Sequence, residues 1–394
     1  MVKAGHLSDI TIVGAGMVGS AAALALARAG FNITLIEANE TPQWSEEDYC
    51  LRVSAISFTS EQLLEDLGVW QRIKNRRISS YEYMYVWDAS GTGRLQFDAA
   101  ECGVAYLGHI VENDLITTSL IEQLQGMSNV RFVIGLRLSS MTWLEDAVQL
   151  RLENGDEIRS KLVIAADGDN SKVRQLCGIN SSRHDYLQTG IVARVRTSLP
   201  HNNTAWQRFL PSGPLAFLPL ADGSCSIVWS ADQQRAKELL ALSDEDFSQQ
   251  LADAIENQLG SVELLSSRAA FPLMLANADS YSADRVVLLG DAAHRVHPLA
   301  GQGVNLGFQD VIGLTAILRE ARQHGRSLAD PLYLRKFART RRADASLMLA
   351  AMDGIQRVFA SKRQSVRRSR NLAMDLINRL PVLKQFFVNR ALGN

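Results

Sequence analysis

The chain has 394 residues, 46% of them hydrophobic and 21% charged, and its 41 basic and 42 acidic residues give a formal net charge of −1. The length exceeds that of one ordinary core, so we expect two domains, and the balanced charge argues against a nucleic-acid partner. No apolar run approaches the roughly 18 residues of a membrane span, and we recognise no signal peptide, so we expect a cytoplasmic protein. The four cysteines are scattered, with no histidine at metal-ligand spacing, so we expect no metal site.

A nucleotide-binding unit is predicted at the start of the chain. The apolar run Ile10–Val13 is typical of a buried parallel strand. In the turn that follows, Gly14 and Gly16 would let the backbone approach a pyrophosphate, and Gly19 would let the next helix pack tightly on the strand. We expect this helix at residues 17–28, with its N-terminal N–H groups directed at the phosphates.

The next strand, Asn32–Ile36, completes this unit and leads to Glu37. Glu37 lies near the distance from the glycines at which an acidic side chain binds a ribose hydroxyl. Two plainer interpretations stay open at this point. The glycines can form a turn in an ordinary βαβ unit, and Glu37 can be a solvated strand end.

Apolar spacing predicts a mixture of helices and strands in the following region. The expected helices are 62–70 and 115–125, and the expected strands are 81–87, 130–134, 148–152 and 158–164. Asn154-Gly155 is a typical hairpin turn between two of these strands. Tyr81, Tyr83, Tyr85 and Trp87 alternate as they would on one strand, which favours packing over substrate contact.

A second glycine motif follows the strand that ends near Ala165, in the run Asp167-Gly168-Asp169-Asn170-Ser171-Lys172-Val173-Arg174. A carboxylate at such a strand end either caps the next helix or accepts a hydrogen bond from a cofactor hydroxyl. Both roles stay open for Asp167.

From about residue 183, short strands separated by proline and glycine turns indicate an antiparallel sheet. The expected strands are 190–196, 205–209, 215–220 and 225–230. We place a substrate-binding domain here, followed by a helix at 243–259, and we expect Trp229 in its core.

A third motif begins with the apolar strand Val286–Leu289 and continues through Gly290 and Asp291. A carboxylate at Asp291 can accept hydrogen bonds from a polyol chain such as ribityl. Glycines after Pro298 would let a helix N-terminus approach a flavin ring and stabilise its negative charge when reduced. A capped strand–helix junction is the alternative. Because three such motifs occur in one chain, we interpret the protein as a flavin enzyme whose cofactor domain is discontinuous in sequence.

The pattern beyond Gly303 is helical to the end of the chain, with breaks at Pro331 and Pro381. From Ile355 onward, nine basic residues stand against Asp375 alone. The basic residues are Arg357, Lys362, Arg363, Arg367, Arg368, Arg370, Arg379, Lys384 and Arg390. This region is either a solvated helical face or a surface that meets anionic lipid or a partner protein.

The set GxGxxG, DGxNSxxR and GDAAHxxxPxxGQGxN resembles that of the single-component flavoprotein aromatic hydroxylases, the para-hydroxybenzoate hydroxylase type, over nearly the whole chain. Within them, residues 52–57, 108–113, 206–207, 217–220 and 297–307 are most similar to the ubiquinone-biosynthesis hydroxylases. Residues 225–230 and 347–350 look like the VisC-like subgroup, which hydroxylates 2-polyprenylphenol next to its phenolic oxygen.

The resemblance implies an α/β fold with a Rossmann-like FAD-binding domain, an inserted antiparallel-sheet substrate domain and a helical C-terminal region. The implied FAD-binding domain consists of residues 1–75, 101–182 and 273–345. The implied substrate domain consists of residues 76–100 and 183–272, and the C-terminal region of residues 346–394.

The resemblance also implies which residues bind the cofactor. The ADP half of FAD would be held by Gly14, Gly16, Gly19 and Glu37. The pyrophosphate, the ribityl chain and the ring edge would be met by Arg52, Gly290 and Asp291. Asp167 and Gly168 would serve both FAD and a transient nicotinamide cofactor. The isoalloxazine would be bordered by Pro298, Gly301, Gly303, Val304 and Asn305. Asn113 stands where many relatives carry Arg or Gln in contact with the cofactor.

The mechanism implied by the resemblance is sequential. NADH or NADPH reduces FAD, O₂ adds to give a flavin hydroperoxide, and the outer oxygen is transferred to the ring of a prenylated phenol. Such a site must exclude water, which an apolar substrate sheet would achieve. Pro298 beside the ring and His294 are the catalytic candidates; for His294, as for His297, a structural role is favoured over removal of the phenolic proton.

The implied partners are other ubiquinone-biosynthesis proteins and, through the basic C-terminal region, the surface of the inner membrane; a homo-oligomer stays open. Alternatives on the same scaffold are a hydroxylase of another aromatic secondary metabolite, a prenyl reductase, and a non-catalytic FAD-bound scaffold. A halogenase would carry a W-x-W-x-I-P stretch, which the sequence lacks.

Overall fold

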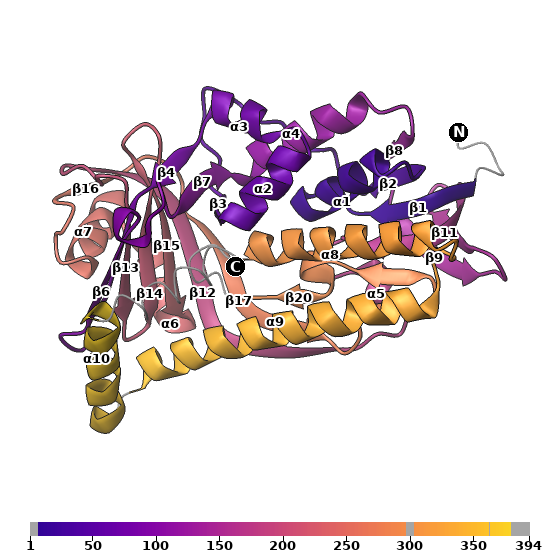
Figure 1. Ribbon diagram of the computed structural model, residues 1–394. Helices are drawn as coiled ribbons and strands as arrows, with labels where there is room; N and C mark the ends of the chain where they lie inside the picture. The colour runs from indigo at the N-terminus through magenta and orange to yellow at the C-terminus, as the bar shows by residue number, and fades with distance from the viewer. Residues whose placement is uncertain (1–6, 297–302, 362, 380–394) are drawn as a thin grey trace.

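The computed structural model describes residues 7–296, 303–361 and 363–379. Its elements form a mostly parallel sheet with helices packed on it, an antiparallel sheet beside it, and a long helix, α9, that runs past both (Figure 1). The predicted α/β class and helical C-terminal region are confirmed, and the second sheet is antiparallel except for one parallel pair of strands.

The first sheet has the strand order β18-β19-β11-β1-β2-β8, and β10 and β9 extend it from β11. Its strands are β1 (Leu7–Val13), β2 (Ile33–Glu37), β8 (Val130–Ile134), β9 (Leu138–Trp143), β10 (Val148–Leu152), β11 (Glu157–Ala165), β18 (Ser282–Ala283) and β19 (Val286–Leu288). The pairs of β1 with β2 and β11, and of β11 with β19, are parallel. The carboxyl ends of β1, β11 and β19 therefore lie side by side, although they are far apart in sequence.

Helices α1 (Met17–Arg28), α4 (Asn113–Gln125) and α8 (Gly303–Gln323) pack together against this sheet. Helix α1 is built mainly from alanine and leucine and is buried from Gly19 to Ala27. Alanine and leucine both favour the helix, and the small alanine side chains let neighbouring elements come close. The shared core includes Ile12, Leu24 and Phe308, each fully buried. This packing fixes the N-terminus of α1 at the sheet edge where the three strands end.

The second sheet has the order β20-β17-β12-β15-β14-β13-β5-β6, with β16 beside β12. Its strands are β5 (Tyr83–Asp88), β6 (Arg94–Asp98), β12 (Ser181–Thr197), β13 (Thr204–Leu210), β14 (Gly213–Pro219), β15 (Cys225–Asp232), β16 (Val262–Leu264), β17 (Ala269–Ala278) and β20 (His294–Arg295). Side chains on alternate positions, such as Phe217 and Trp229, pack under α6 (Gln233–Ala241) and α7 (Asp244–Ala254). The opposite face of the sheet turns toward the first sheet.

A small sheet, β3 (Val53–Ile56), β7 (Gly108–Glu112) and β4 (Ser79–Tyr81), lies with α2 (Phe58–Asp66) and α3 (Trp70–Arg76). Two sequence-based expectations were wrong here. The helix expected at 62–70 is two helices, because Gly68 takes a left-handed φ of +71° between them. The strand expected at 81–87 is divided between two sheets, so Tyr81 does not share a strand with Tyr83.

Two further boundaries differ from those expected. The helix expected at 243–259 ends at Ala254, where Glu256 and Asn257 adopt left-handed backbone angles. The strand expected at 190–196 is β12, which extends from Ser181 to Thr197 and pairs with β17 along most of its length. The predicted domain division has a boundary at residue 272, within β17 of the second sheet, and it stays a prediction. The short elements η1 (Ala100–Cys102), η2 (Gly290–Ala292) and α5 (Lys172–Leu176) complete the fold.

The C-terminal helices α9 (Pro331–Ala360) and α10 (Gln364–Arg379) hold the outer edge of the second sheet. Arg370 is buried and pairs with buried Asp88, and Arg367 donates to the carbonyl of Ser90. Phe359 stacks on Phe209 with ring centroids 3.7 Å apart. Part of the basic C-terminal region is therefore internal. Lys362, Pro381, Lys384 and Arg390 lie outside the described residues.

Candidate active site

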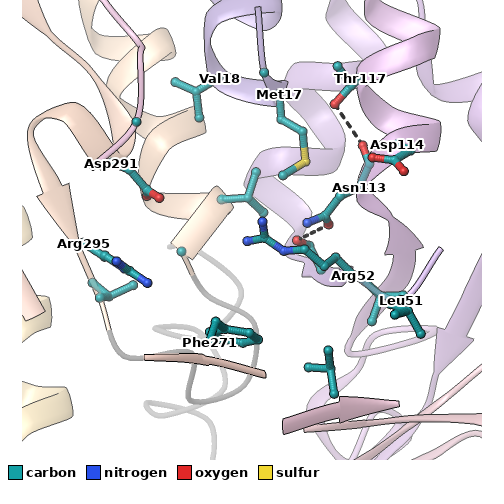
Figure 2. A pocket seen from close by; sticks show the side chains of 18 of the residues that line it. Met17, Val18, Leu51, Arg52, Asn113, Asp114, Thr117, Phe271, Asp291 and Arg295 are labelled. Atoms are coloured by element: carbon teal, nitrogen blue, oxygen red, sulfur yellow. Dashed lines mark hydrogen bonds between the residues drawn. The ribbon is translucent and has the colours of Figure 1, made fainter. Parts of the chain in front are cut away.

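A cavity of about 680 Å³ lies between the glycine turn after β1 and the inner face of the second sheet (Figure 2). One part of its wall comes from the three motifs, from β3 and the segment before it, and from the start of α4. These residues are Gly16, Met17, Val18, Pro42, Leu51, Arg52, Val53, Ser54, Asn113, Asp114, Thr117, Ala166, Gly168, Leu289, Asp291, Arg295, Val296, Gly303 and Val304. The other part is formed by Val192, Ala216, Leu218, Ser226, Val228, Phe271, Leu273 and Met274.

The three glycines of the first turn have different surroundings. Gly14 has a φ of +103°, and a Cβ atom on it would lie 2.3 Å from the carbonyl oxygen of Ala166. A Cβ on Gly19 would lie 1.9 Å from the carbonyl oxygen of Gly14. A Cβ on Gly16 would meet nothing within 4 Å, and Gly16 lines the cavity. Gly14 and Gly19 are therefore required by the fold, whereas Gly16 leaves space that a ligand can approach.

Glu37 braces this turn. Its Oε2 accepts a hydrogen bond from the backbone N–H of Ala15 at 2.7 Å, and its Oε1 accepts one from Asn39 at 3.0 Å. Glu37 does not line the cavity itself. Its contact with a ribose hydroxyl stays a prediction.

The second motif combines a helix cap with an open glycine. Asp167 Oδ2 accepts from the backbone N–H groups of Lys172 and Val173 at 2.7 and 3.2 Å, so the carboxylate caps α5. Burial raises the pKa of Asp167 above its ordinary value. Gly168, at φ +80°, lines the cavity with no atom near its missing side chain. Of this pair, only Gly168 lines the cavity, and cofactor contact by either residue stays a prediction.

Asp291 of the third motif points into the cavity (Figure 2). The residue is exposed, and it faces the cavity. Desolvation raises its pKa, and the neighbouring His294, Arg295 and Arg52 partly oppose this shift. The position suits an acceptor for hydroxyl groups of a ligand in the cavity.

The structure places His294 away from the cavity wall. It is 2% exposed, and its Nε2 lies 2.6 Å from Oδ2 of the fully buried Asp310. The same Oδ2 accepts from the backbone N–H of Gly290 at 3.0 Å, and Oδ1 accepts from Nε of Arg341 at 2.8 Å. His294 thus belongs to a buried network that fixes the third motif, so this geometry favours the structural role over the catalytic one. Pro298 and Gly301, like His297, lie outside the described residues.

The N-terminus of α8 faces the cavity with Gly303 and Val304. The side chain of Asn305 turns the other way. Its Oδ1 accepts from Ser57 N at 3.1 Å and from Ser60 Oγ at 2.7 Å, while its Nδ2 donates to the carbonyl of Ala55 at 2.8 Å. Asn305 therefore joins α8 to β3 and α2 and does not border the cavity through its side chain.

Arg52 and Asn113 lie together on the cavity wall (Figure 2). Asn113 N donates to the carbonyl of Arg52 at 3.0 Å, and Ser54 Oγ donates to Asn113 Oδ1 at 2.7 Å. The segment that carries Arg52 is fixed by buried Glu112, which accepts a hydrogen bond from Cys50 N at 2.8 Å and forms an ion pair with Arg77, whose Nε lies 2.9 Å from its Oε2. The sequence did not reveal this role of Glu112, because its partners lie far away in the chain.

The sheet wall of the cavity was not predicted residue by residue. Ala216, Leu218, Ser226 and Val228 face the cavity, while their strand neighbours Leu215, Phe217, Ile227 and Trp229 face α6 and α7. Strand alternation in a two-sided sheet produces this division. Both faces are largely apolar, so the hydrophobic pattern could not show which one meets the cavity.

These features fit a flavin dinucleotide. Gly16 is the N-cap residue of α1, and no side chain caps this end of the helix. The first N–H groups of α1 are therefore available to a phosphate. Asp291 supplies an acceptor, and the N-terminus of α8 supplies a positive dipole end. The adjoining apolar wall would hold an aromatic substrate.

Comparison with known proteins agrees with this geometry. A model of the FAD binding domain family matches residues 8–349. The chain is 38% identical over 387 residues to the 3-demethoxyubiquinol 3-hydroxylase of Escherichia coli (strain K12), covering 98% of each chain. It is 36% identical to the mitochondrial ubiquinone biosynthesis monooxygenase COQ6 of Danio rerio, covering 96% of this chain and 88% of that one. The crystal structure of p-nitrophenol 4-monooxygenase PnpA from Pseudomonas putida DLL-E4 matches with a TM-score of 0.80 at 18% identity, over 98% of each chain.

Gly16→Ala is expected to leave the fold intact and to weaken FAD binding at least tenfold, because the added methyl group projects into the space next to the cavity. Gly14→Ala is the matched control with the opposite outcome, since its methyl group collides with the Ala166 carbonyl. We expect Gly14→Ala to lower the free energy of unfolding of the FAD-free protein. Urea denaturation and FAD titration measure the two effects; equal FAD affinity for Gly16→Ala and wild type would contradict the assignment.

Asp291→Asn is expected to stabilise the FAD-free protein. It is also expected to weaken FAD binding about tenfold or more, which corresponds to the loss of one hydrogen bond to a charged acceptor. The pKa of Asp291 is raised in the folded state, so its carboxylate costs stability above that pKa and costs nothing below the unfolded value. The gain in unfolding free energy should therefore be largest at pH 8 and shrink on acidification. A gain in unfolding free energy that grows toward low pH would contradict a raised pKa for Asp291.

Proposed function

We propose that this chain, which belongs to the FAD-dependent monooxygenase family of the ubiquinone-biosynthesis hydroxylases, hydroxylates the aromatic ring of a prenylated phenol. The family's cofactor is FAD. When bound, FAD accepts electrons from NADH or NADPH and activates O₂ for insertion into the ring. The observation that carries the proposal is one cavity that joins a glycine turn suited to a dinucleotide with an apolar sheet wall.

The cofactor side of the cavity would act mainly through backbone groups. The N-terminus of α1 at Gly16 would bind the pyrophosphate, and Asp291 would accept hydrogen bonds from the polyol chain. The N-terminus of α8, at Gly303 and Val304, would stabilise negative charge on the reduced ring. Arg52 adds a cation on the opposite wall (Figure 2).

The substrate side of the cavity would exclude water. Its sheet wall presents Val192, Leu218, Val228 and Phe271, and its residues named above include no titratable group. Exclusion of water protects a reactive oxygen species from unproductive decay. The phenolic proton would then leave without a protein base on this wall, in agreement with the position of His294 inside the buried network.

The proposed reaction is tested with the purified FAD-loaded protein, a short-chain 2-prenylphenol, NADPH and ¹⁸O₂. We expect the phenol to accelerate NADPH oxidation at least tenfold and one ¹⁸O atom to enter the ring. Mass spectrometry locates the label, and the reaction without phenol is the control. Reduction of the prenyl chain without oxygen uptake would instead indicate a reductase, and NADPH oxidation that no phenol affects would indicate a non-catalytic scaffold.

We also propose that the C-terminal helices contact an anionic membrane surface, where a long-chain prenylated substrate would be found. Arg368, Leu372 and Leu376 follow one another at four-residue spacing on α10, which places them on one helix face, and the two leucines are 71% and 50% exposed. Ile355 and Val358 are also exposed. The opposite face of α10, with Arg370, packs on the second sheet. None of the described helices is long and apolar enough to span a bilayer, so the proposed contact is peripheral.

The double substitution Leu372→Glu and Leu376→Glu is expected to reduce co-sedimentation with phosphatidylglycerol vesicles at least tenfold. A leucine contributes about 1.5–3 kcal/mol when fully buried, and the new charges repel the lipid. Leu332→Glu, at the 68% exposed position near the start of α9, is the matched control and should bind like wild type. Unchanged binding of the double variant would disprove the contact. Association with other ubiquinone-biosynthesis proteins and with a second copy stays a prediction.

A further inference from the structure

Ser226 is a polar group in an otherwise apolar part of the cavity wall. It lies on β15 and lines the cavity next to Val228, while its residue is only 3% exposed. In the sheet it stands opposite Leu218 of β14 and Arg194 of β12. A buried hydroxyl in such surroundings is unfavourable unless it finds a hydrogen-bond partner.

None of the described residues forms a hydrogen bond with the Ser226 hydroxyl. The neighbouring Arg194 is already engaged, because its Nε donates to Ser224 Oγ at 3.0 Å and its guanidinium pairs with Asp222. The remaining close neighbours, Leu218 and Val228, carry no polar side-chain atom. The Ser226 hydroxyl is thus available to a molecule in the cavity.

The two other hydroxyl groups that line the cavity are used within the protein. Ser54 Oγ donates to Asn113 Oδ1 at 2.7 Å, and Thr117 Oγ1 donates to the carbonyl of Asn113 at 3.0 Å. Both lie on the cofactor side of the cavity. Ser226 lies on the sheet wall, where an aromatic substrate would be placed.

We infer that Ser226 recognises the substrate by a hydrogen bond between its hydroxyl and the phenolic oxygen. This inference rests on the proposed function and deepens it, since it names the side chain that tells a phenol from an arene without oxygen. A serine hydroxyl can donate to a phenolic or phenolate oxygen, and the bond is stronger when that oxygen is charged. The bond would fix which ring carbon faces the cofactor while the apolar neighbours hold the ring and the prenyl chain.

The inference is tested by binding alone, with the oxidised FAD-loaded protein and no reductant. A short-chain 2-prenylphenol and the corresponding prenylbenzene, which lacks the hydroxyl, are each titrated while the flavin absorbance is recorded. For Ser226→Ala we expect affinity for the phenol to fall about five- to tenfold, the range for one neutral hydrogen bond. Affinity for prenylbenzene should stay within about twofold of wild type on the same scale.

Ser230→Ala is the matched control, because Ser230 lies on the same strand and is 2% exposed but does not line the cavity. It should bind both ligands like wild type. FAD content and circular dichroism of Ser226→Ala show that it is folded. Equal loss for both ligands, or no loss for the phenol, would overturn the role of Ser226 while leaving the proposed function in place. A wild-type protein that binds neither ligand would overturn both.

Discussion

The structure depends on the close contact between the backbone after β1 and the backbone after β11. The Ala166 carbonyl occupies the space that a side chain on Gly14 would need, and Gly19 brings α1 equally close to that turn. Because β1, β11 and β19 are adjacent and parallel, this contact brings Gly16, Gly168 and Asp291 to one edge of the sheet. Ligand sites in open α/β sheets form at the carboxyl ends of the strands for this reason. The sheet order thus explains why one cavity is lined by segments that are distant in sequence.

A buried charge network holds the third of these segments in place. Burial alone would raise the pKa of Asp310, but His294 and Arg341 outweigh it, so the pKa lies below the ordinary value. Asp310 thereby joins Gly290, at the end of β19, to Arg341 of α9. A buried carboxylate with several donors is strongly destabilised when one partner is lost. His294 is therefore needed as one of the partners of Asp310. Because Arg341 is another, α9 also helps to hold the cavity in place.

Much of the fold and of the cofactor side could be predicted from the sequence, because both depend on local patterns. Helix 17–28 and strands 130–134 and 148–152 have the bounds that apolar spacing indicated, and Gly16, Gly168 and Asp291 line the cavity. A motif alone does not distinguish a side chain that binds the protein from one that binds a ligand. Asp167 caps α5, one of the two roles that the sequence left open, and Asn305 binds Ala55, while contact of either residue with a cofactor stays a prediction. Side chains whose partners are distant in sequence could not be predicted. Ser226 and Glu112 were missed because only the packed sheets show what each side chain faces.

The two walls of the cavity impose different requirements on sequence. As proposed, the cofactor wall would act largely through backbone groups, helix ends and glycines, whose positions depend on the fold. A TM-score of 0.80 to a structure only 18% identical shows that this fold is kept when most side chains differ. The sheet wall consists of side chains from β12, β14, β15 and β17, and on β14 and β15 these alternate with the side chains that pack beneath α6 and α7. If the proposed function holds, substrate choice can change through the sheet wall while the cofactor wall is retained, and Ser226, the polar residue among those named for the sheet wall, is the position where a substitution would alter that choice most.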